Sequence, residues 1–325
     1  MPADREVEDL LRPGVAIVVC TCDRPKSLQG FLRSLAAEGH RPAQLIIVDG
    51  SRTDATHQLL EIQDARDLAG AVQYFRVPPH LRGLTRQRNF GLRHVSTDLV
   101  AFFDDDVQLL PGCLREMEAA HRLLGPRAVG VGARIEGGQQ RPGALWRLRR
   151  FLRVVSSLRP GAYEPSGMSI PWWAADQENG LLEGDWLPGG ATMWKTAIAR
   201  EVGFNEAFEG YGQGEDLDFC LRIRGKGKLF LAPAARVKHL RNPEGRPDPY
   251  VLGYMEIRNR YQIHREALPA RHRRETIWFF YAWIVDTLLL ARDLFRPGRG
   301  RFGLRRMMGR LGAMCDIIGL RVASS

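Results

Sequence analysis

The feature that most constrains the fold is an alternation of short apolar runs with amphipathic segments in the N-terminal part of the chain. Residues 15–22 (VAIVVCTC) and 44–50 (QLIIVDG) are continuous, β-branched runs, which are typical of strands buried on both faces of a parallel sheet. The first run is followed by apolar residues at helical spacing, namely Leu28, Phe31, Leu32 and Leu35. Further strands are predicted at 72–77 and 98–107, with a helix at 85–95 between them. This order predicts an α/β fold with a mostly parallel central sheet flanked by helices.

Basic residues are concentrated in two segments of the chain. The 325 residues carry a formal net charge of +10. Residues 141–160 contain six arginines and no acidic residue, and residues 241–325 contain 16 arginines against eight acidic residues. The rest of the chain is therefore mildly acidic. That distribution argues against a protein whose main surface binds nucleic acid, because phosphate binding needs basic side chains there.

The domain organisation follows from these shifts in composition. Residues 1–13 form a charged leader without the apolar run of a secretory signal, and the α/β domain is expected over 14–240. Within it, 142–173 is rich in Arg, Gly, Ser and Pro and is expected to be an exposed insertion or mobile loop. From 241 to 325 the sequence becomes a basic helical extension. Residues 228–240 (KLFLAPAARVKHL) are predicted to form a last pair of strands.

Cysteine usage and hydropathy indicate the compartment. Five cysteines are scattered along the chain without the spacing of a disulfide framework or a zinc site, so we expect buried, reduced thiols. The longest apolar run, 277–291, has 15 residues with Asp286 inside it, which is short of the about 20 residues that span a bilayer. These features predict a cytoplasmic protein.

Acidic residues stand where the predicted strands end. Asp23, Asp49 and the triplet Asp104–Asp106 follow three of these strands, and ligands of open α/β sheets bind at the carboxyl ends of strands. Neither a P-loop nor a G-x-G-x-x-G motif is present. Adjacent carboxylates repel one another, and a divalent cation with oxygen ligands, Mg²⁺ or Mn²⁺, relieves that repulsion and can bridge to a diphosphate. In an extended backbone Asp104 and Asp106 point to one face and Asp105 to the other; an exposed acidic turn is the alternative.

Six motifs in register carry a resemblance to a known family. They are TCDRP (21–25), LIIVDGSRTD (45–54), TRQRNFGL (85–92), FFDDDV (102–107), LPGGATMW (187–194) and GEDLDFCLR (214–222). In this order they resemble the inverting family-2 nucleotide-sugar glycosyltransferases of GT-A fold, over about residues 14–240. The resemblance implies a GT-A type sheet and a single-displacement transfer that needs a metal ion and a general base.

The resemblance assigns the donor side of the site. Asp23 and Asp49 match the positions that hydrogen-bond the nucleobase and nucleoside, and both also fit helix capping at strand–helix turns. Arg88 and Asn89 match an R-N-x-G element that shapes the nucleotide pocket, although a surface ion pair would equally explain Arg88. Within the D-x-D motif, the resemblance implies that Asp104 contacts the ribose and Asp106 the metal. Asp105 occupies the variable position and is grouped with the residues that bind the nucleotide sugar.

The resemblance also assigns the acceptor side. Asp216 is expected to be the base that deprotonates the acceptor hydroxyl, with Glu215 orienting it; ordinary acidic residues in a first helical turn are the alternative. The acceptor loop matches Asp185, Trp186, Gly189 and Gly190. Trp186 could equally fill a core. His239 ends the last strand where some relatives use a further metal ligand, and a structural histidine is the alternative.

The C-terminal extension is predicted to contain amphipathic helices. One helical face collects Leu304, Met307, Met308, Leu311, Met314, Cys315 and Ile318, and four arginines fall largely away from it, Arg301, Arg305, Arg306 and Arg310. Upstream, the aromatic segment 277–291 lies between Arg271–Arg274 and Arg292–Arg296. This pattern is typical of helices in an anionic membrane interface, and packing on the α/β domain or on a partner subunit is the alternative.

The sequence therefore predicts a metal-dependent inverting glycosyltransferase at the inner face of the cell membrane. Its partners would be a nucleotide-sugar donor, a glycan or lipid-linked acceptor and the anionic membrane surface, with no nucleic acid. A sugar-nucleotide pyrophosphorylase would need a Gly-rich, Lys/Arg-bearing signature after the first strand, which residues 21–27 (TCDRPKS) lack. A non-catalytic basic protein that binds membrane or RNA would tolerate replacement of Asp104, Asp106 and Asp216.

Overall fold

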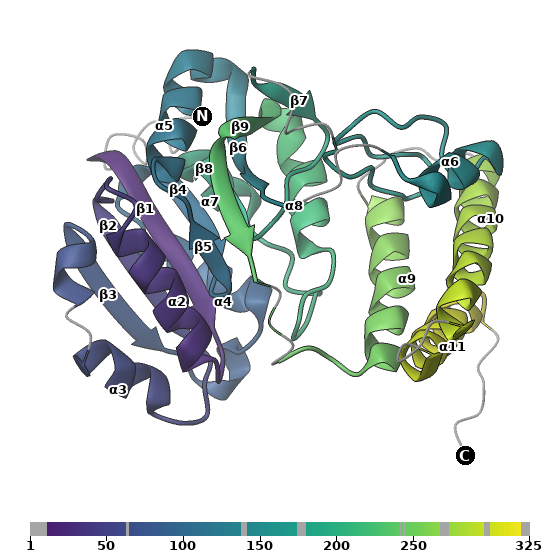
Figure 1. The fold of residues 1–325 in the computed structure, drawn as a ribbon, viewed down its shortest axis with the longest axis horizontal. Coiled ribbons are helices and arrows are strands. Elements are labelled where there is room, and N and C mark those ends of the chain that lie inside the picture. The colour runs from purple at the N-terminus through teal and green to yellow at the C-terminus, as the bar shows by residue number, and fades with distance from the viewer. Residues whose placement is uncertain are drawn as a thin grey trace. The chain divides into compact units, whose positions relative to one another are not determined.

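The computed structural model divides the chain into two compact units (Figure 1). It describes residues 12–62, 65–137, 142–173, 180–240, 242, 245–266, 273–295 and 300–319. The sheet unit comprises Met1–Gln140 and Ala174–Gly245, and the helical unit comprises Arg141–Trp173 and Arg246–Ser325. Most of the leader expected at 1–13 lies outside the described residues.

The sheet unit is built on one sheet whose strand order is β3-β2-β1-β4-β8-β6-β9-β5, with β7 paired to β9. The described strands are β1 (Arg12–Thr21), β2 (Gln44–Asp49), β3 (Ala71–Arg76), β4 (Thr97–Asp104), β5 (Val107–Leu109), β6 (Ala128–Ile135), β7 (Leu182–Gly184), β8 (Ala191–Lys195) and β9 (Lys228–His239). Strands β3, β2, β1 and β4 are parallel, β6 is parallel to β9, and β8 runs antiparallel between β4 and β6. The predicted fold class is confirmed.

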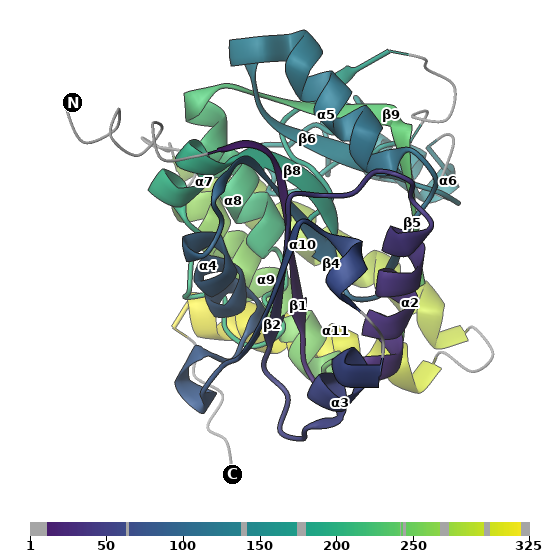
Figure 2. The same cartoon turned by 90° about the vertical axis from the view of Figure 1, so that its left-hand side faces the viewer.

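Helices cover both faces of this sheet (Figure 2). On one side lie α2 (Pro25–Ala36) and α5 (Cys113–Leu124), and on the other lie α4 (Leu84–Arg93), α7 (Thr196–Val202) and α8 (Glu215–Ile223). A short helix, α3 (Ala55–Ile62), follows β2. Alternate residues of β1 face the two layers, as the pleat requires.

The alternation in β1 explains the composition of both layers. Val15, Ile17 and Val19 are buried in one cluster with the apolar stripe of α2. On the opposite face, a Cβ added at Gly91 of α4 would lie 2.5 Å from Cγ1 of Val18. The glycine of R-N-x-G therefore permits α4 to pack closely on the sheet.

Strands β1, β2, β4 and β9 run in the same direction, so that their carboxyl ends lie at the same edge of the sheet. This arrangement collects the predicted acidic residues and His239 at one edge. The strand pair predicted at 228–240 is instead a single strand, β9, with a register shift at Ala133/Arg134 of its partner β6. Pro233 has no N–H to donate to a ladder, so the strand continues through an irregularity rather than a turn.

The helical unit contains α6 (Ala144–Phe151), α9 (Pro249–Glu266), α10 (Arg273–Leu289), the 3₁₀ helix η5 (Leu290–Phe295) and α11 (Gly300–Ile317). Its core joins the helices to the segment predicted as an exposed insertion: Val155, Ile170 and Trp173 are buried with Phe279 and other residues of α10 and α11. Residues 142–173 thus supply part of this unit's core. The prediction of an exposed insertion was wrong because the apolar residues of this segment have no helical period, and an irregular segment can be buried as fully as a helix.

The buried residues of α11 come from both of its predicted faces: Met314 and Arg310 are buried, whereas Arg301 and Arg305 are exposed. Arg310 is 4% exposed and pairs with Glu256 of α9 at 2.7 Å and with Asp286 of α10 at 2.9 Å. Asp286 also pairs with Arg149 of α6 at 2.6 Å. The large apolar side chains Leu304, Met308, Leu311 and Ile318 are exposed.

Close backbone packing fixes this orientation of α11. A side chain at Gly309 would overlap the carbonyl of Tyr250, and one at Gly253 would overlap that of Arg306. Helices α9 and α11 therefore approach through glycines, and the buried face of α11 is set by small residues and paired arginines. Within the parts of the chain that the structure describes, no helix has both the length and the hydropathy to cross a membrane.

Candidate functional site

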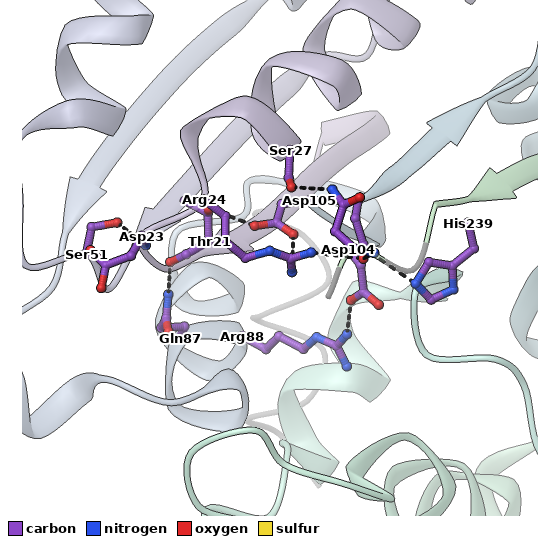
Figure 3. Close-up of polar contacts among 12 residues, drawn as sticks. Thr21, Asp23, Arg24, Ser27, Ser51, Gln87, Arg88, Asp104, Asp105 and His239 are labelled. Atoms are coloured by element: carbon purple, nitrogen blue, oxygen red, sulfur yellow. Dashed lines mark hydrogen bonds and ion pairs between the residues drawn. The ribbon is translucent and has the colours of Figure 1, made fainter. Parts of the chain in front are cut away.

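The aspartate triplet at the end of β4 makes two sets of contacts (Figure 3). Asp104 and Asp106 lie with His239 of β9, and the ligand atoms of all three lie within 4.8 Å of one another. Asp105 is 3% exposed. Asp105 and Asp106 form a turn rather than the extended backbone that the sequence prediction assumed, and both contact Arg24. Backbone bonds hold the triplet in place, because Asp104 N donates to Gly190 O and Leu240 N donates to Asp106 O.

Asp105 is part of the framework rather than of the open cluster. Its Oδ2 accepts a hydrogen bond from Thr21 Oγ1 at 2.8 Å, and its Oδ1 pairs with Arg24 at 2.8 Å. Burial raises the pKa of the Asp105 carboxyl to about 7, against the opposing effects of Arg24 and Thr21. The predicted role of Asp105 in holding the nucleotide sugar stays a prediction, and its contacts are with β1 and the start of α2.

The cluster of Asp104, Asp106 and His239 has the donor set of a divalent-cation site. His239 Nε2 lies 3.1 Å from Asp106 Oδ1, close to the separation of about 3 Å between neighbouring ligand atoms on an octahedral ion with bonds of about 2.1 Å. Burial favours the neutral form of Asp106, but His239 and Arg24 hold the pKa of its carboxyl well below the usual range. Two carboxylates and an imidazole fit Mn²⁺, and the oxygens alone fit Mg²⁺.

Arg88 connects the aspartate cluster to the E-D pair at the start of α8. The guanidinium is 3% exposed, and it bonds Asp104 Oδ1 at 3.0 Å and Glu215 Oε1 at 2.8 Å. It also lies 5.3 Å from the centre of the Phe204 ring. The surface ion pair considered for Arg88 is therefore wrong, because this arginine is a buried bridge between two motifs far apart in sequence.

Glu215 is buried against this bridge. Burial raises the pKa of Glu215 to about 8, although Arg88 acts in the opposite direction. Its Oε2 is buried without a hydrogen-bond partner among the described residues. A carboxyl in such surroundings is stabilised in its protonated form near neutral pH, and it therefore suits the orienting role better than that of a base.

Asp216 is half-buried and follows Glu215 in the first turn of α8. Its Oδ2 accepts a hydrogen bond from Gly189 N at 3.1 Å, and Gly189 O accepts one from Arg88 at 3.2 Å. A Cβ at Gly189 would lie 2.5 Å from Cβ of Asp216, and one at Gly190 would lie 2.5 Å from Asp104 Oδ2. The two glycines are thus required so that a backbone loop can pass between the D-x-D motif and the E-D pair.

The other predicted residues fall into two groups. Asp23 adopts a positive φ of 54° and receives a hydrogen bond from Arg52 N at 2.9 Å. Asp49 is completely buried and accepts hydrogen bonds from Ser51 N at 2.7 Å and from the Tyr74 hydroxyl at 2.8 Å. Both aspartates organise the loops at the ends of β1 and β2, and neither provides a side-chain cap to α2.

Asn89 and Asp185 make their contacts outside the cluster of Asp104, Asp106 and His239. Asn89 holds the loop after α7, because its amide and carbonyl bond the backbone of Phe204 at 2.9 and 2.8 Å. Asp185 lies 3.9 Å from Arg224, on the segment between β7 and β8 that also holds the half-buried Trp186. Asn89 thus fixes the loop after α7, and its predicted role in the nucleotide pocket stays a prediction.

Sequence reasoning gave no role to two residues at this edge. Arg24 Nη2 lies 2.9 Å from Asp106 Oδ2, so that this arginine bridges Asp105 and Asp106. Gln87 is buried and donates to the carbonyls of Thr21 and Val48 at 3.1 and 2.9 Å (Figure 3). Arg24 lies within the motif TCDRP and Gln87 within TRQRNFGL. Their polar side chains, at positions expected to pack against the sheet edge, could have indicated that both bind other polar groups there.

This combination of features defines the class of fold. The mostly parallel sheet with an antiparallel strand between β4 and β6, and an acidic cluster at the carboxyl edge, is an α/β fold of GT-A type. Residues 16–171 match the model of glycosyl transferase family 2, which confirms the resemblance to that family over this part of the chain.

Two relatives that are named as glycosyltransferases match part of the chain. The chain is 30% identical over 168 residues to a pre-mycofactocin glycosyltransferase of Mycobacterium tuberculosis, which covers 50% of this chain and 31% of that protein. It is 26% identical over 102 residues to a GalNAc(5)-diNAcBac-PP-undecaprenol β-1,3-glucosyltransferase of Campylobacter jejuni, which covers 31% of this chain and 32% of that protein. The match thus spans about a third of the length of these relatives.

Solved structures share the fold at low sequence identity. A mannosyltransferase of Pyrobaculum calidifontis in complex with GDP-Man and Mn²⁺ superposes with a TM-score of 0.56 and 14% identity, over 97% of this chain and 94% of the other. GalNAc-T7 with UDP, GalNAc and Mn²⁺ gives a TM-score of 0.55 and 16% identity, over 89% of this chain and 59% of the other.

Proposed function

We propose that this protein is a metal-dependent inverting glycosyltransferase that moves a sugar from a nucleotide-diphosphate sugar to a hydroxyl of a glycan or lipid-linked acceptor. The observation that carries the proposal is the cluster of Asp104, Asp106 and His239, connected through Arg88 and Gly189 to Asp216. Structures of the same fold contain nucleotides or nucleotide sugars together with Mn²⁺.

The cluster supplies the donor half of the reaction. A divalent cation held by Asp104, Asp106 and His239 would neutralise charge on the departing diphosphate. Asp104 has a side chain 31% exposed, so that it is open to a ligand, whereas that of Asp106 is 8% exposed. Arg24 partly neutralises Asp105 and Asp106, which allows these adjacent carboxylates to lie close together.

Asp216 supplies the acceptor half. As base, its carboxylate would take the proton of the acceptor hydroxyl while the acceptor oxygen bonds to the anomeric carbon and the bond from that carbon to the diphosphate breaks. Attack on the face opposite the leaving group inverts the configuration. The N–H of Gly189 orients this carboxylate, which stands in the first turn of α8.

The test of this function uses the full chain, a panel of nucleotide-diphosphate sugars and Mn²⁺ or Mg²⁺. Wild type should show thermal protection and slow donor hydrolysis, and chelation of the metal should abolish both. Asp106→Asn should lose them, whereas Asp98→Asn, at the exposed opposite end of β4, should behave as wild type.

A second variant separates binding from chemistry. Asp216→Asn should bind nucleotide as wild type does and lose transfer by about 100-fold or more, the usual effect of removing a general base. If no nucleotide diphosphate protects wild type any better than it protects Asp106→Asn, the transferase proposal is refuted.

We further propose that the protein works at the inner face of the cell membrane, through its helical unit. The exposed side chains along α10 are Ile277, Tyr281, Ile284 and Leu288, at helical spacing, with the exposed Arg274 before them. The outward apolar face of α11 adds to this surface. Apolar stripes beside arginines are typical of interfacial helices, and one relative acts, by its name, on an undecaprenol-linked glycan.

Flotation with vesicles of phosphatidylcholine and phosphatidylglycerol tests this association. The double variant Ile284→Ser/Leu288→Ser should lose binding by about tenfold or more. Leu123→Ser removes an 80% exposed apolar residue from α5 and should not change it. Equal binding by all three proteins would refute the role of α10.

A further inference from the structure

The helical unit contains a cavity that is open to the surface and lined mostly by exposed side chains, and the proposed transfer does not use it. Its volume is about 800 Å³, and it is lined by Pro142, Arg147, Arg150, Phe151 and Leu158. This volume falls in the range of sites for organic ligands, about 300–1,000 Å³, and far exceeds what a single inorganic anion needs. The lining combines two guanidinium groups with three apolar side chains.

The lining side chains share one face of α6. Arg147, Arg150 and Phe151 stand at positions i, i+3 and i+4, which place them together on a helix. The opposite face holds Arg149, which pairs with Asp286 at 2.6 Å, and the neighbouring Trp146 packs its ring on Trp173 at 5.2 Å between centroids. The inner face thus anchors α6 and leaves the cationic and aromatic face free to contact a ligand.

Charge on this face is not neutralised by the protein. In the part of the chain that the structure describes, the buried Arg149 is paired with Asp286 at 2.6 Å, whereas Arg147 and Arg150 are exposed and no carboxylate of a described residue pairs with either of them. Residues 141–160 contain no acidic side chain. Two adjacent unpaired guanidiniums are a suitable arrangement for a phosphate, because each can donate two parallel hydrogen bonds.

The cavity adjoins an apolar surface of the same unit. Phe151 is 82% exposed at its edge. The next residue, Leu152, accepts a hydrogen bond from the Tyr281 hydroxyl at 2.7 Å, and Arg153 O accepts one from Trp278 at 2.7 Å. The exposed stripe of α10 therefore begins beside the cationic cavity. A headgroup in the cavity would have its chain directed along apolar side chains.

We propose that this cavity binds the phosphate headgroup of a membrane lipid, with Arg147 and Arg150 on the phosphate and Phe151 and Leu158 on the first carbons of the chain. This inference rests on the membrane association proposed above and does not depend on sugar transfer. It would place a phosphate-bearing lipid, the chemical class of a lipid-linked acceptor, on the helical unit.

The test measures binding of the full chain to three soluble probes by calorimetry: geranyl phosphate, geraniol and inorganic phosphate. Geranyl phosphate should bind at least tenfold more tightly than inorganic phosphate, and geraniol should not bind. Arg147→Gln/Arg150→Gln should weaken geranyl phosphate binding tenfold or more, and Phe151→Ser at least threefold.

Two matched controls keep the test specific. Arg115→Gln/Arg122→Gln on α5 removes the same charge from exposed positions, and Leu123→Ser removes an equally exposed apolar side chain. Equal affinity of the α6 and α5 variants, or equal affinity of wild type for inorganic and geranyl phosphate, would overturn the proposal. Because all these side chains are exposed, unchanged thermal unfolding should accompany each substitution.

The outcome is independent of the transferase test. If nucleotide-diphosphate sugars protect the protein but geranyl phosphate does not bind, the lipid site is refuted and the transferase proposal stands. If geranyl phosphate binds through α6 and no nucleotide is bound, the lipid site stands and the transferase proposal is refuted.

Discussion

Replacement of Arg310 by methionine tests why α11 faces the way it does. The guanidinium is 4% exposed and bonds Glu256 at 2.7 Å and Asp286 at 2.9 Å. Removing one partner of a buried ion pair costs about 3–5 kcal/mol, because a charge stays buried without compensation. Here each carboxylate keeps one other partner, Asp286 with Arg149 and Glu256 with Arg306. We therefore expect the lower end, about 3 kcal/mol.

This loss should be read from thermal unfolding followed by circular dichroism. At about 2–4 °C per kcal/mol for a large domain, the midpoint of Arg310→Met should fall by about 6–12 °C. Arg306→Met, whose side chain is 27% exposed, should lose about 1 kcal/mol or less. Nucleotide binding by the sheet unit should stay unchanged.

A double-mutant cycle makes the reasoning refutable. Glu256→Leu/Arg310→Met removes the buried charge together with its partner, and the double variant should be more stable than Arg310→Met alone. A midpoint for Arg310→Met within 2 °C of wild type, or strictly additive losses in the cycle, would show that the pair does not fix α11.

Three further predictions concern the sheet unit. Gly189→Ala brings a Cβ to 2.5 Å from that of Asp216, so transfer should fall about 100-fold in a kinetic assay, with nucleotide binding retained. Gly91→Ala places a Cβ 2.5 Å from Val18 and should lower the free energy of unfolding by about 1–3 kcal/mol in urea titrations. The raised pKa of Glu215, about 8, stabilises the fold below the unfolded pKa of about 4.3, and this stability is lost as the pH rises through 8. Glu215→Gln should thus flatten the fall in unfolding midpoint between pH 5 and 8, and an unchanged slope would contradict the burial argument.

The sequence predicted that acidic residues gather at the carboxyl ends of the parallel strands, and the structure places Asp104 and Asp106 there. Alternation along an extended chain does not explain why Asp104 and Asp106 lie together, because Asp105 and Asp106 form a turn after β4 and both contact Arg24. His239 joined them because β9 ends at the same edge as β4. Arg88 could not be weighed in the same way, since its partners, Asp104 and Glu215, are brought together only by the folded sheet.

Residues 142–173 show the limit of arguments from periodicity. The irregular sequence around Val155 and Ile170 predicted an exposed loop, but both side chains are completely or almost completely buried in the helical unit. Irregular backbone can be buried when it is tied to its neighbours by hydrogen bonds: Ile170 N donates to Ala162 O at 2.7 Å, and the Trp173 indole donates to Leu158 O at 3.0 Å. Such contacts have no period in the sequence.

Helix α11 shows that an amphipathic pattern defines two faces without saying which is buried. Charge normally decides, because an unpaired buried arginine is very unfavourable. Here Glu256 and Asp286 offer partners to Arg310 inside the unit, and glycines at 253 and 309 let the paired face approach α9. The apolar side chains are then left about half exposed, which forgoes part of the about 1.5–3 kcal/mol that full burial of each would contribute. A lipid surface would recover that energy without disturbing the buried pairs. Under the membrane association proposed above, the acidic residues that hold Arg310 inside the unit therefore also leave the apolar side chains available to a lipid surface.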